Sequence, residues 1–361
     1  MDKERYQRQT VLKGFGEVAQ TKLAQASVLV IGAGGLGCPA LQYLVAAGIG
    51  KIGIADDDRI ELSNLQRQVL FTSTNIGELK VEIAAKRLKE MNPDVEIVLF
   101  PFAIDTETVF EVISNYDIIL DGTDNFKSRY IINDACTLAK KPLVFAAVSG
   151  FEGQLAVFNT VDEQGFSTNY RDLFPVEPIA TEIPNCAENG VLGVLPGILG
   201  TMAAGEIIKH ITGIGKTLAN KLLQYNLLNQ EQYEIKITPS SAYKITKVNS
   251  RKQPNLEKTY LEIDAENMLE LAKSPLTILV DVREKHEFPR LDLNIYRQAP
   301  MSDFGTFVSS EIEEENIILI CQHGIRSVAA AELLHEKYGN TKTIYSLKGG
   351  ISKWRNHFAT T

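Results

Sequence analysis

Short apolar runs alternate with helical patterns along roughly the first 160 residues of the chain. Five of these runs predict strands, at 27–32, 51–56, 95–100, 117–121 and 142–148. Strands that alternate with helices are typical of βαβ units, so we expect an α/β fold with a mostly parallel sheet. The next run, Gly153–Phe158, predicts a strand with no crossover helix after it, which makes the expected sheet mixed.

The pattern then changes and later starts again. A Gly-rich helical pattern covers roughly 192–212, and residues 238–258 are mostly polar. A second, smaller α/β pattern begins at about 259. Its predicted elements are three strands and a helix, at Leu276–Val280, Ile317–Ile320, Thr343–Tyr345 and Val328–Tyr338. We therefore expect a first domain over 1–240, a linker over 241–258 and a second domain over 259–361.

Composition restricts the class of protein. The chain has 361 residues, of which 44% are hydrophobic and 23% charged, as in globular proteins. The net charge of −8 argues against nucleic acid as a partner. No apolar run reaches about 18 residues and the charged N-terminus lacks a signal-peptide core, so we expect a cytoplasmic protein without a membrane span.

The four cysteines, Cys38, Cys136, Cys186 and Cys321, are far apart in the sequence. None lies in a C-x-x-C pair, so neither a disulfide framework nor a structural zinc site is expected. Cys38 and Cys136 lie in apolar or helical patterns, which predicts that both are small buried side chains.

A glycine-rich turn follows the first predicted strand. Gly32, Gly34, Gly35 and Gly37 lie between that strand and a helical pattern, and Asp56 ends the second apolar run. Such glycines let backbone N–H groups approach a phosphate at a helix N-terminus, and the acidic residue can bind a ribose hydroxyl. This pattern alone would also fit an NAD-dependent oxidoreductase.

The run Ser63-Asn64-Leu65-Gln66-Arg67-Gln68 changes this interpretation. A hydride-transfer enzyme does not need an arginine and several amides beside the phosphates, whereas an enzyme that attacks a phosphoryl group does. Asp57 and Asp58 precede this run, and we expect both to be solvated turn residues.

Three further motifs carry a family resemblance. Arg5–Gln9 lies near the N-terminus, Lys80 follows Asn64 after sixteen residues, and Asp121–Asn125 follows the strand at 117–121. Together with the glycine loop, they resemble the MoeB/ThiF/HesA family of adenylyltransferases, relatives of the ubiquitin-activating enzymes, over about residues 4–235. The resemblance implies a Rossmann-like adenylation domain that uses ATP and Mg²⁺.

The resemblance also implies roles for single residues. Gly35 lies under the phosphates and Asp56 holds the ribose. Asp124 binds Mg²⁺, and Arg8 reaches across a homodimer into the neighbouring site. Asn64, Arg67 and Lys80 contact the triphosphate and stabilise charge at the α-phosphorus. The implied nucleotide-binding residues are Gly32, Gly34, Gly35, Gly37, Asp56, Ser63, Asn64, Leu65, Gln66, Arg67, Lys80, Asp124 and Asn125.

Cys186 lies in a Pro- and Asn-rich loop before the Gly-rich helical pattern, and a nearby helix N-terminus can lower a thiol pKa. In the family, the matching cysteine lies on a crossover loop, and in several members it bonds to the carrier protein. The alternative is that Cys186 is dispensable. Relatives often also carry two C-x-x-C pairs for zinc. Here Asn169–Asp172 stands at the first place and no cysteine lies between 186 and 321, so other contacts must hold this region.

Cys321 follows the strand at 317–320, and four residues separate it from Arg326. Phosphatase-like loops use five residues, and the tighter loop suits a persulfide sulfur. With Asp281–Glu284 and Leu347–Trp354, residues 259–361 resemble a single rhodanese domain. The resemblance implies that Cys321 carries a persulfide and that Arg326 stabilises the loop or binds substrate. An inactive docking module is the alternative.

The two resemblances predict one pathway. ATP would activate the C-terminal Gly-Gly carboxylate of a ubiquitin-like sulfur carrier, and the Cys321 persulfide would convert it to a thiocarboxylate. The match is closest to molybdopterin-synthase adenylyltransferases fused to rhodanese, with a cysteine desulfurase as an expected sulfur donor. Thiamine synthesis, tRNA thiolation and cysteine synthesis use similar carriers. A different carboxylate substrate, with rhodanese as a docking module, stays open.

Overall fold

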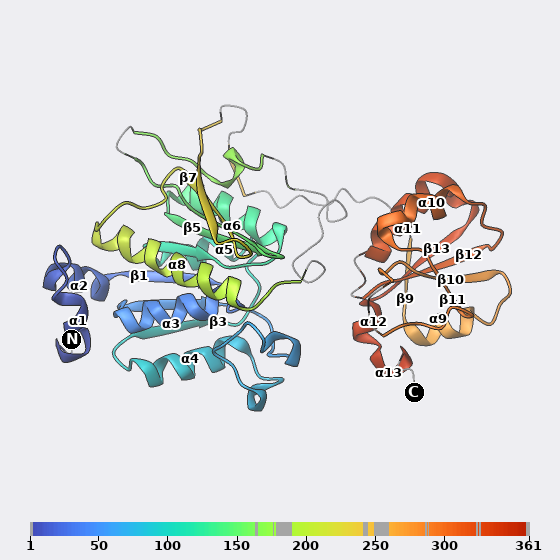
Figure 1. Cartoon of the computed structure of the whole chain (residues 1–361), viewed down its shortest axis with the longest axis horizontal. Coiled ribbons are helices and arrows are strands. Elements are labelled where there is room, and N and C mark those ends of the chain that lie inside the picture. The colour runs from blue at the N-terminus through green and yellow to red at the C-terminus, as the bar shows by residue number, and fades with distance from the viewer. Residues whose placement is uncertain are drawn as a thin grey trace. The chain divides into compact units, whose positions relative to one another are not determined.

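The computed structural model describes residues 3–162, 165–175, 177, 190–240, 245–248, 260–285, 287, 289–322, 324 and 326–358. These residues form two compact units (Figure 1). The described part of the first unit ends at Val248, and that of the second begins at Tyr260.

The first unit is built on an eight-stranded sheet in the order β3-β2-β1-β4-β5-β6-β7-β8. The strands are β1 (Ser27–Ile31), β2 (Lys51–Ala55), β3 (Glu96–Phe100), β4 (Ile118–Asp121), β5 (Leu143–Ser149), β6 (Glu152–Phe158), β7 (Lys221–Asn226) and β8 (Glu231–Lys236). Neighbours from β3 to β5 pair in parallel, and β5 to β8 pair antiparallel. The mixed sheet and its six strands predicted from apolar runs are thereby confirmed. All six residues of β8 are exposed, and β8 forms one edge of the sheet.

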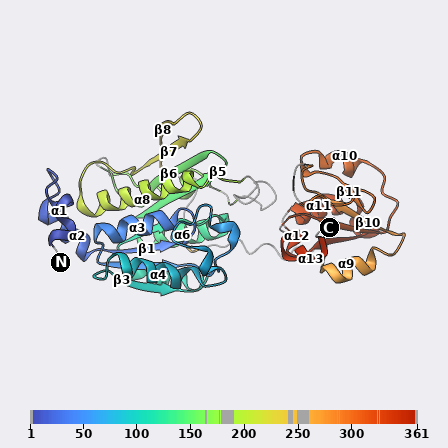
Figure 2. The same cartoon turned by 60° about the horizontal axis from the view of Figure 1, so that its bottom comes forward.

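Helices cover both faces of this sheet (Figure 2). Val28 and Val30 of β1 face a core shared with α3, α4 and α8, whereas Leu29 and Ile31 face a core shared with α5 and α6. This alternation follows from the two-residue period of a strand whose two faces are both covered. The helices and short 3₁₀ turns are α1 (Lys3–Thr10), α2 (Gly16–Gln25), α3 (Gly37–Ala47), η1 (Leu62–Asn64), η2 (Ser73–Asn75), α4 (Lys80–Met91), α5 (Val109–Ser114), α6 (Phe126–Ala139), η3 (Tyr170–Asp172) and α8 (Val194–Thr212).

The strand order reverses direction at β1. From β1 the chain moves to β2 and β3 on one side, and later returns to β4 and β5 on the other. The carboxyl ends of β1 and β4 are therefore adjacent, and the loops after them bound the crevice where ligands of such sheets bind.

The N-terminal helix α1 lies at the opposite, amino edge of the sheet. The Tyr6 hydroxyl accepts a hydrogen bond from Asn92 at 2.8 Å, and Asn92 follows the last residue of α4. Crossover helices run antiparallel to the strands, so the C-terminal end of α4 marks the amino edge. Arg8, an exposed residue of α1, therefore lies away from the glycine loop of its own chain.

The second unit contains a parallel five-stranded sheet in the order β11-β10-β12-β13-β9. Its strands are β9 (Leu261–Ile263), β10 (Thr277–Asp281), β11 (Tyr296–Gln298), β12 (Asn316–Ile320) and β13 (Thr343–Leu347). Its helices and turns are α9 (Ala265–Leu271), η4 (Met301–Asp303), α10 (Phe304–Ser309), α11 (Arg326–Tyr338), η5 (Gly339–Thr341), α12 (Gly350–Lys353) and α13 (Arg355–Phe358). One core lies under α10 and α11, and the other under α9, α12 and α13. The three strands and the helix predicted for this region are confirmed.

Among the described residues, no helix is long and apolar enough to cross a membrane.

Candidate active sites

The glycine loop after β1 has no room for side chains at two positions. A Cβ atom on Gly37 would lie 1.8 Å from the carbonyl oxygen of Gly32. Gly32 has φ +95°, and a Cβ atom there would lie 2.9 Å from the oxygen of Gly122, which follows β4. These contacts require glycine and bring the loops after β1 and β4 together at the start of α3.

Asp56 ties the end of β2 to this loop. Its carboxylate accepts hydrogen bonds from the backbone N–H groups of Ala33 at 2.7 Å and Asp58 at 2.9 Å. Burial raises the pKa of Asp56, although the nearby Lys80 ammonium and the two N–H groups act in the opposite direction. The carboxylate predicted to hold a ribose thus lies beside the predicted phosphate loop.

Lys80 is buried although it is the first residue of α4. Its exposed fraction is 4%, and its Nζ donates to Asp58 Oδ2 at 2.7 Å. The side chain of Asp58 remains 67% exposed, as a solvated turn residue would, but it also holds the charge of Lys80. Sequence reasoning missed this pairing because the two residues are 22 positions apart.

The run 63–68 packs over the glycine loop. Arg67 Cγ lies 3.2 Å from the position of a Cβ on Gly35, and Arg67 Nη1 donates to the Ser63 carbonyl at 3.2 Å. The Asn64 side chain caps η1 by accepting the Glu61 N–H at 3.2 Å. Leu65 is half-buried and Gln66 is exposed.

Gln68 is a residue that the sequence analysis did not assign. It is 3% exposed and its Nε2 lies 3.8 Å from the position of a Cβ on Gly34. Its Oε1 has no hydrogen-bond partner among the described residues. The signal that could have identified Gln68 in the sequence is its position next to Arg67 in the run 63–68.

The end of β4 and the loop after it place three polar side chains in different environments. Asp121 is fully buried and accepts the N–H and hydroxyl of Thr123, and burial raises its pKa despite the nearby Arg129 guanidinium. Asn125 caps α6 by accepting the Ser128 N–H at 2.9 Å. Asp124, the predicted Mg²⁺ ligand, is exposed at the carboxyl edge of the sheet.

Three other carboxylates also lie together near the loop. Oxygen atoms of Asp56, Asp57 and Asp58 are within 4.8 Å of one another. Carboxylate oxygens suit Mg²⁺, which commonly keeps one or two protein carboxylates and completes its shell with phosphate oxygens and water. The exposed carboxylate of Asp124 can therefore serve as one of the protein ligands of Mg²⁺.

Two of the three cysteines between residues 1 and 240 lie among the described residues. Cys38 and Cys136 are completely buried, as predicted, and burial raises the pKa of Cys38 to about 12 and raises that of Cys136 further. Cys186 lies outside the described residues.

Hydrogen bonds and an ion pair hold the segment Asn169–Asp172, the segment that the family resemblance matched to a first C-x-x-C pair. Asp172 Oδ2 accepts from the backbone N–H and the Nδ2 of Asn169, at 2.8 and 2.9 Å. Asp172 Oδ1 accepts the Ser240 N–H at 2.7 Å, which joins η3 to the segment after β8. Arg171 adds a buried two-point ion pair with Asp134, at 2.6 and 2.7 Å. These contacts join η3 to α6 and to the segment after β8.

In the second unit, Cys321 follows β12 and is 1% exposed. Its sulfur accepts the Gly324 N–H at 3.1 Å and lies 3.4 Å from the Ser327 hydroxyl. Gly350 packs against this loop, since a Cβ there would lie 2.5 Å from the Cys321 carbonyl oxygen.

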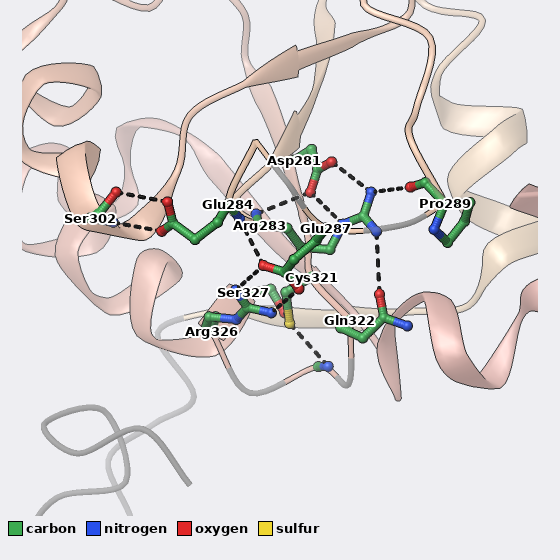
Figure 3. A network of polar contacts seen from close by, with 11 residues as sticks. Asp281, Arg283, Glu284, Glu287, Pro289, Ser302, Cys321, Gln322, Arg326 and Ser327 are labelled. Carbon is green, nitrogen blue, oxygen red and sulfur yellow. Dashed lines mark hydrogen bonds and ion pairs between the residues drawn. The ribbon is translucent and has the colours of Figure 1, made fainter. Parts of the chain in front are cut away.

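Arg326 begins α11 and points to an acidic residue that the sequence analysis did not assign. Its Nη1 and Nη2 donate to the two carboxylate oxygens of Glu287 at 2.5 and 2.7 Å (Figure 3). The two residues are 39 positions apart, so no local pattern revealed the pair.

Two family models match successive parts of the chain. The ThiF family model matches residues 6–268, and the rhodanese-like domain model matches residues 264–357.

Curated relatives cover one or both parts. A "Sulfur carrier protein adenylyltransferase" of Thermus thermophilus is 48% identical over 62% of this chain and 83% of the relative. A "Probable adenylyltransferase/sulfurtransferase MoeZ" of Mycobacterium tuberculosis is 36% identical over 97% of this chain and 92% of the relative. A "Probable molybdopterin-synthase adenylyltransferase" of Porphyra purpurea is 37% identical over 98% and 92%.

Among solved structures, the E. coli protein MccB is similar with a TM-score of 0.58 at 21% identity, over 68% of this chain and 72% of that one. This likeness concerns the fold alone.

Proposed function

The chain belongs to the ThiF family and carries a rhodanese-like domain, and on this premise we propose that it turns a sulfur carrier's C-terminal carboxylate into a thiocarboxylate. It is an adenylyltransferase and sulfurtransferase, like relatives that match nearly its whole length. The carrier would end in Gly-Gly, so that no side chain stands beside its reacting carboxylate.

Adenylation joins two anions. A carboxylate oxygen of the carrier attacks the α-phosphorus of ATP, and pyrophosphate leaves with the electron pair of the broken P–O bond. Lys80 and Arg67 offset the repulsion and the charge that develops at the phosphorus. Arg67 packs over Gly35 of the glycine loop, and this contact is the observation that supports adenylation over hydride transfer.

Asp124 would hold Mg²⁺ at the exposed carboxyl edge of the sheet, and this ion would neutralise phosphate charge when bound. Asp56 would hold the ribose. Asn64 and the Gly32–Gly37 loop would contact the phosphates, in keeping with the family motif.

Sulfur transfer follows in two steps. The terminal sulfur of a Cys321 persulfide attacks the acyl carbon of the adenylate, and AMP leaves, giving an acyl disulfide. A second thiolate then attacks Cys321 Sγ and releases the carrier thiocarboxylate. Cys186 is our candidate for this thiolate, and an external thiol would reduce the resulting disulfide.

The proposal includes a homodimer in the cytoplasm. Arg8 lies away from the glycine loop of its own chain, so it would act in the neighbouring site. The sulfur donor would be a protein such as a cysteine desulfurase.

Carrier-dependent exchange of pyrophosphate into ATP tests the first half. We expect exchange with one Gly-Gly-ending carrier in the presence of Mg²⁺, and none with Asp124→Asn. Cys321→Ser should keep the exchange but form no thiocarboxylate. The thiocarboxylate is detected as a mass gain of the carrier, which this variant should lack. Exchange without any Gly-Gly carrier would point to a different carboxylate substrate. Full thiocarboxylate yield from Cys321→Ser would refute the sulfur step.

A further inference from the structure

The cation of the Cys321 loop is neutralised within its own unit. Both terminal nitrogens of Arg326 donate to the carboxylate of Glu287 (Figure 3). A planar two-point pair of this kind combines charge with fixed geometry and is among the strongest polar contacts in proteins.

Glu287 is held in the ionised state that this pair requires. Partial burial tends to raise the pKa of Glu287, but the hydrogen bonds from Arg326 and from the Glu284 N–H outweigh it, and the pKa is lowered overall. The Glu284 N–H lies 2.8 Å from Glu287 Oε1.

Arg283 and Asp281, also labelled in Figure 3, form a second two-point pair. Arg283 is 1% exposed and donates to both carboxylate oxygens of Asp281, at 2.9 and 2.8 Å, and to the carbonyl oxygen of Pro289. Glu284 accepts from the Ser302 hydroxyl at 2.9 Å. The described residues of this network thus carry three carboxylates, of Asp281, Glu284 and Glu287, and two guanidinium groups, of Arg283 and Arg326.

We propose that Glu287 sets the donor preference of the sulfur site, selecting persulfide donors of the form R–S–S–H over dianionic donors such as thiosulfate. The proposal rests on the sulfur-transfer function proposed above. A dianion needs a cation in the site, and pairing with Glu287 removes the attraction that Arg326 would otherwise offer. A persulfide has at most one charge at its sulfane end.

The two donors deliver the same atom with different leaving groups. The Cys321 thiolate attacks the sulfane sulfur in both cases, and the S–S bond of the donor breaks as the new S–S bond forms. The electron pair leaves with the donor thiolate from a persulfide, or with sulfite from thiosulfate. No external oxidant or reductant is needed.

Steady-state sulfur transfer to cyanide in the full chain tests the proposal, with cysteine persulfide and thiosulfate as alternative donors. We expect the wild type to prefer cysteine persulfide. In Glu287→Gln, the kcat/KM for thiosulfate should rise about tenfold through a lower KM, as expected for one freed charge-assisted hydrogen-bonding group. The kcat/KM for cysteine persulfide should change by less than about twofold.

Glu284→Gln is the matched control, since it removes an equal charge from the same network without releasing Arg326. An equal rise in this variant would overturn the proposal. The gain of Glu287→Gln should also disappear in the double variant Glu287→Gln/Arg326→Gln, and its persistence there would equally contradict the proposal.

Folding is followed independently through Trp354, the only tryptophan, which lies in the second unit. If Glu287→Gln is unfolded by this measure, Glu287→Asp provides the test, with a smaller rise in the same direction; no rise in a folded Glu287→Asp would refute the proposal. A wild type that uses thiosulfate as well as persulfide would overturn this inference only. A wild type that accepts sulfur from neither donor would refute the sulfur-transfer function as well.

Discussion

At the scale of single residues, the positive charges of Lys80 and Arg326 are paired with carboxylates in two different ways. Each carries a positive charge beside a predicted reacting group, and each is bonded to a carboxylate from a distant part of the sequence. Asp58 is largely exposed, so phosphate oxygens can compete with it for Lys80. Glu287 binds Arg326 through both of its oxygens, so that pair is harder to open.

Lys80→Met should lower carrier-dependent pyrophosphate exchange about a hundredfold, as expected when one preorganised donor to developing charge is removed. Lys86→Met, on the exposed side of the same helix, is the control and should stay near wild-type exchange. An equal loss in both variants would mean that Lys80 acts only through the stability of α4.

At the scale of elements, the glycine loop and α3 depend on two close backbone contacts. Gly37→Ala should destabilise the first unit by about 2–3 kcal/mol, because its Cβ would overlap the Gly32 carbonyl. Gly205→Ala in α8 meets nothing within 4 Å and should be neutral or stabilising by up to about 1 kcal/mol. Hydrogen–deuterium exchange of the β1 amides measures both, and similar protection in the two variants would contradict this account.

Asp172 is predicted to hold the segment after β8 against η3. Asp172→Ala removes its bonds to Asn169 and Ser240 and should cost about 1–2 kcal/mol of stability. Faster amide exchange at Ser240, with unchanged exchange in β1, is the expected result. Unchanged exchange at Ser240 would mean that other contacts hold this segment.

The sequence pattern was sufficient to predict a strand whose two faces are both buried. The runs at 27–32 and 317–320 form β1 and β12, and a strand that is covered on both faces is apolar at successive positions. The run Glu231–Lys236 gave no such signal, because β8 buries neither face. The glycine loop and the Cys321 loop were predictable from local spacing, whereas the carboxylates paired with Lys80 and Arg326 were not, since the fold alone brings them together.

At the scale of the whole molecule, both units present their predicted chemistry at the carboxyl ends of parallel strands. Gly32 and Asp56 follow β1 and β2, and Cys321 follows β12. Arg8 is the exception, because it lies at the amino edge of its sheet.

A mixture of two inactive variants tests whether Arg8 acts between chains. Arg8→Ala and Asp124→Ala should each lose exchange, but together they should recover about a quarter of wild-type activity, since half of randomly formed two-fold dimers contain one intact site. The two variants measured separately at the same total concentration are the control. No recovery in a mixture that forms mixed dimers would rule out action across the interface.

The exposed edge strand β8 carries a consequence for solubility. Among the described residues no strand pairs with its outer edge, so its backbone groups there are a template for adding further strands, and the charges of Glu231, Glu234 and Lys236 oppose such growth. Repulsion between whole molecules fades as pH approaches the pI of about 5.4. Light scattering should therefore rise as pH falls from 8 toward about 5.4, and more steeply for Glu234→Val. That result would mean that charges remote from both reactions protect the chain from aggregation.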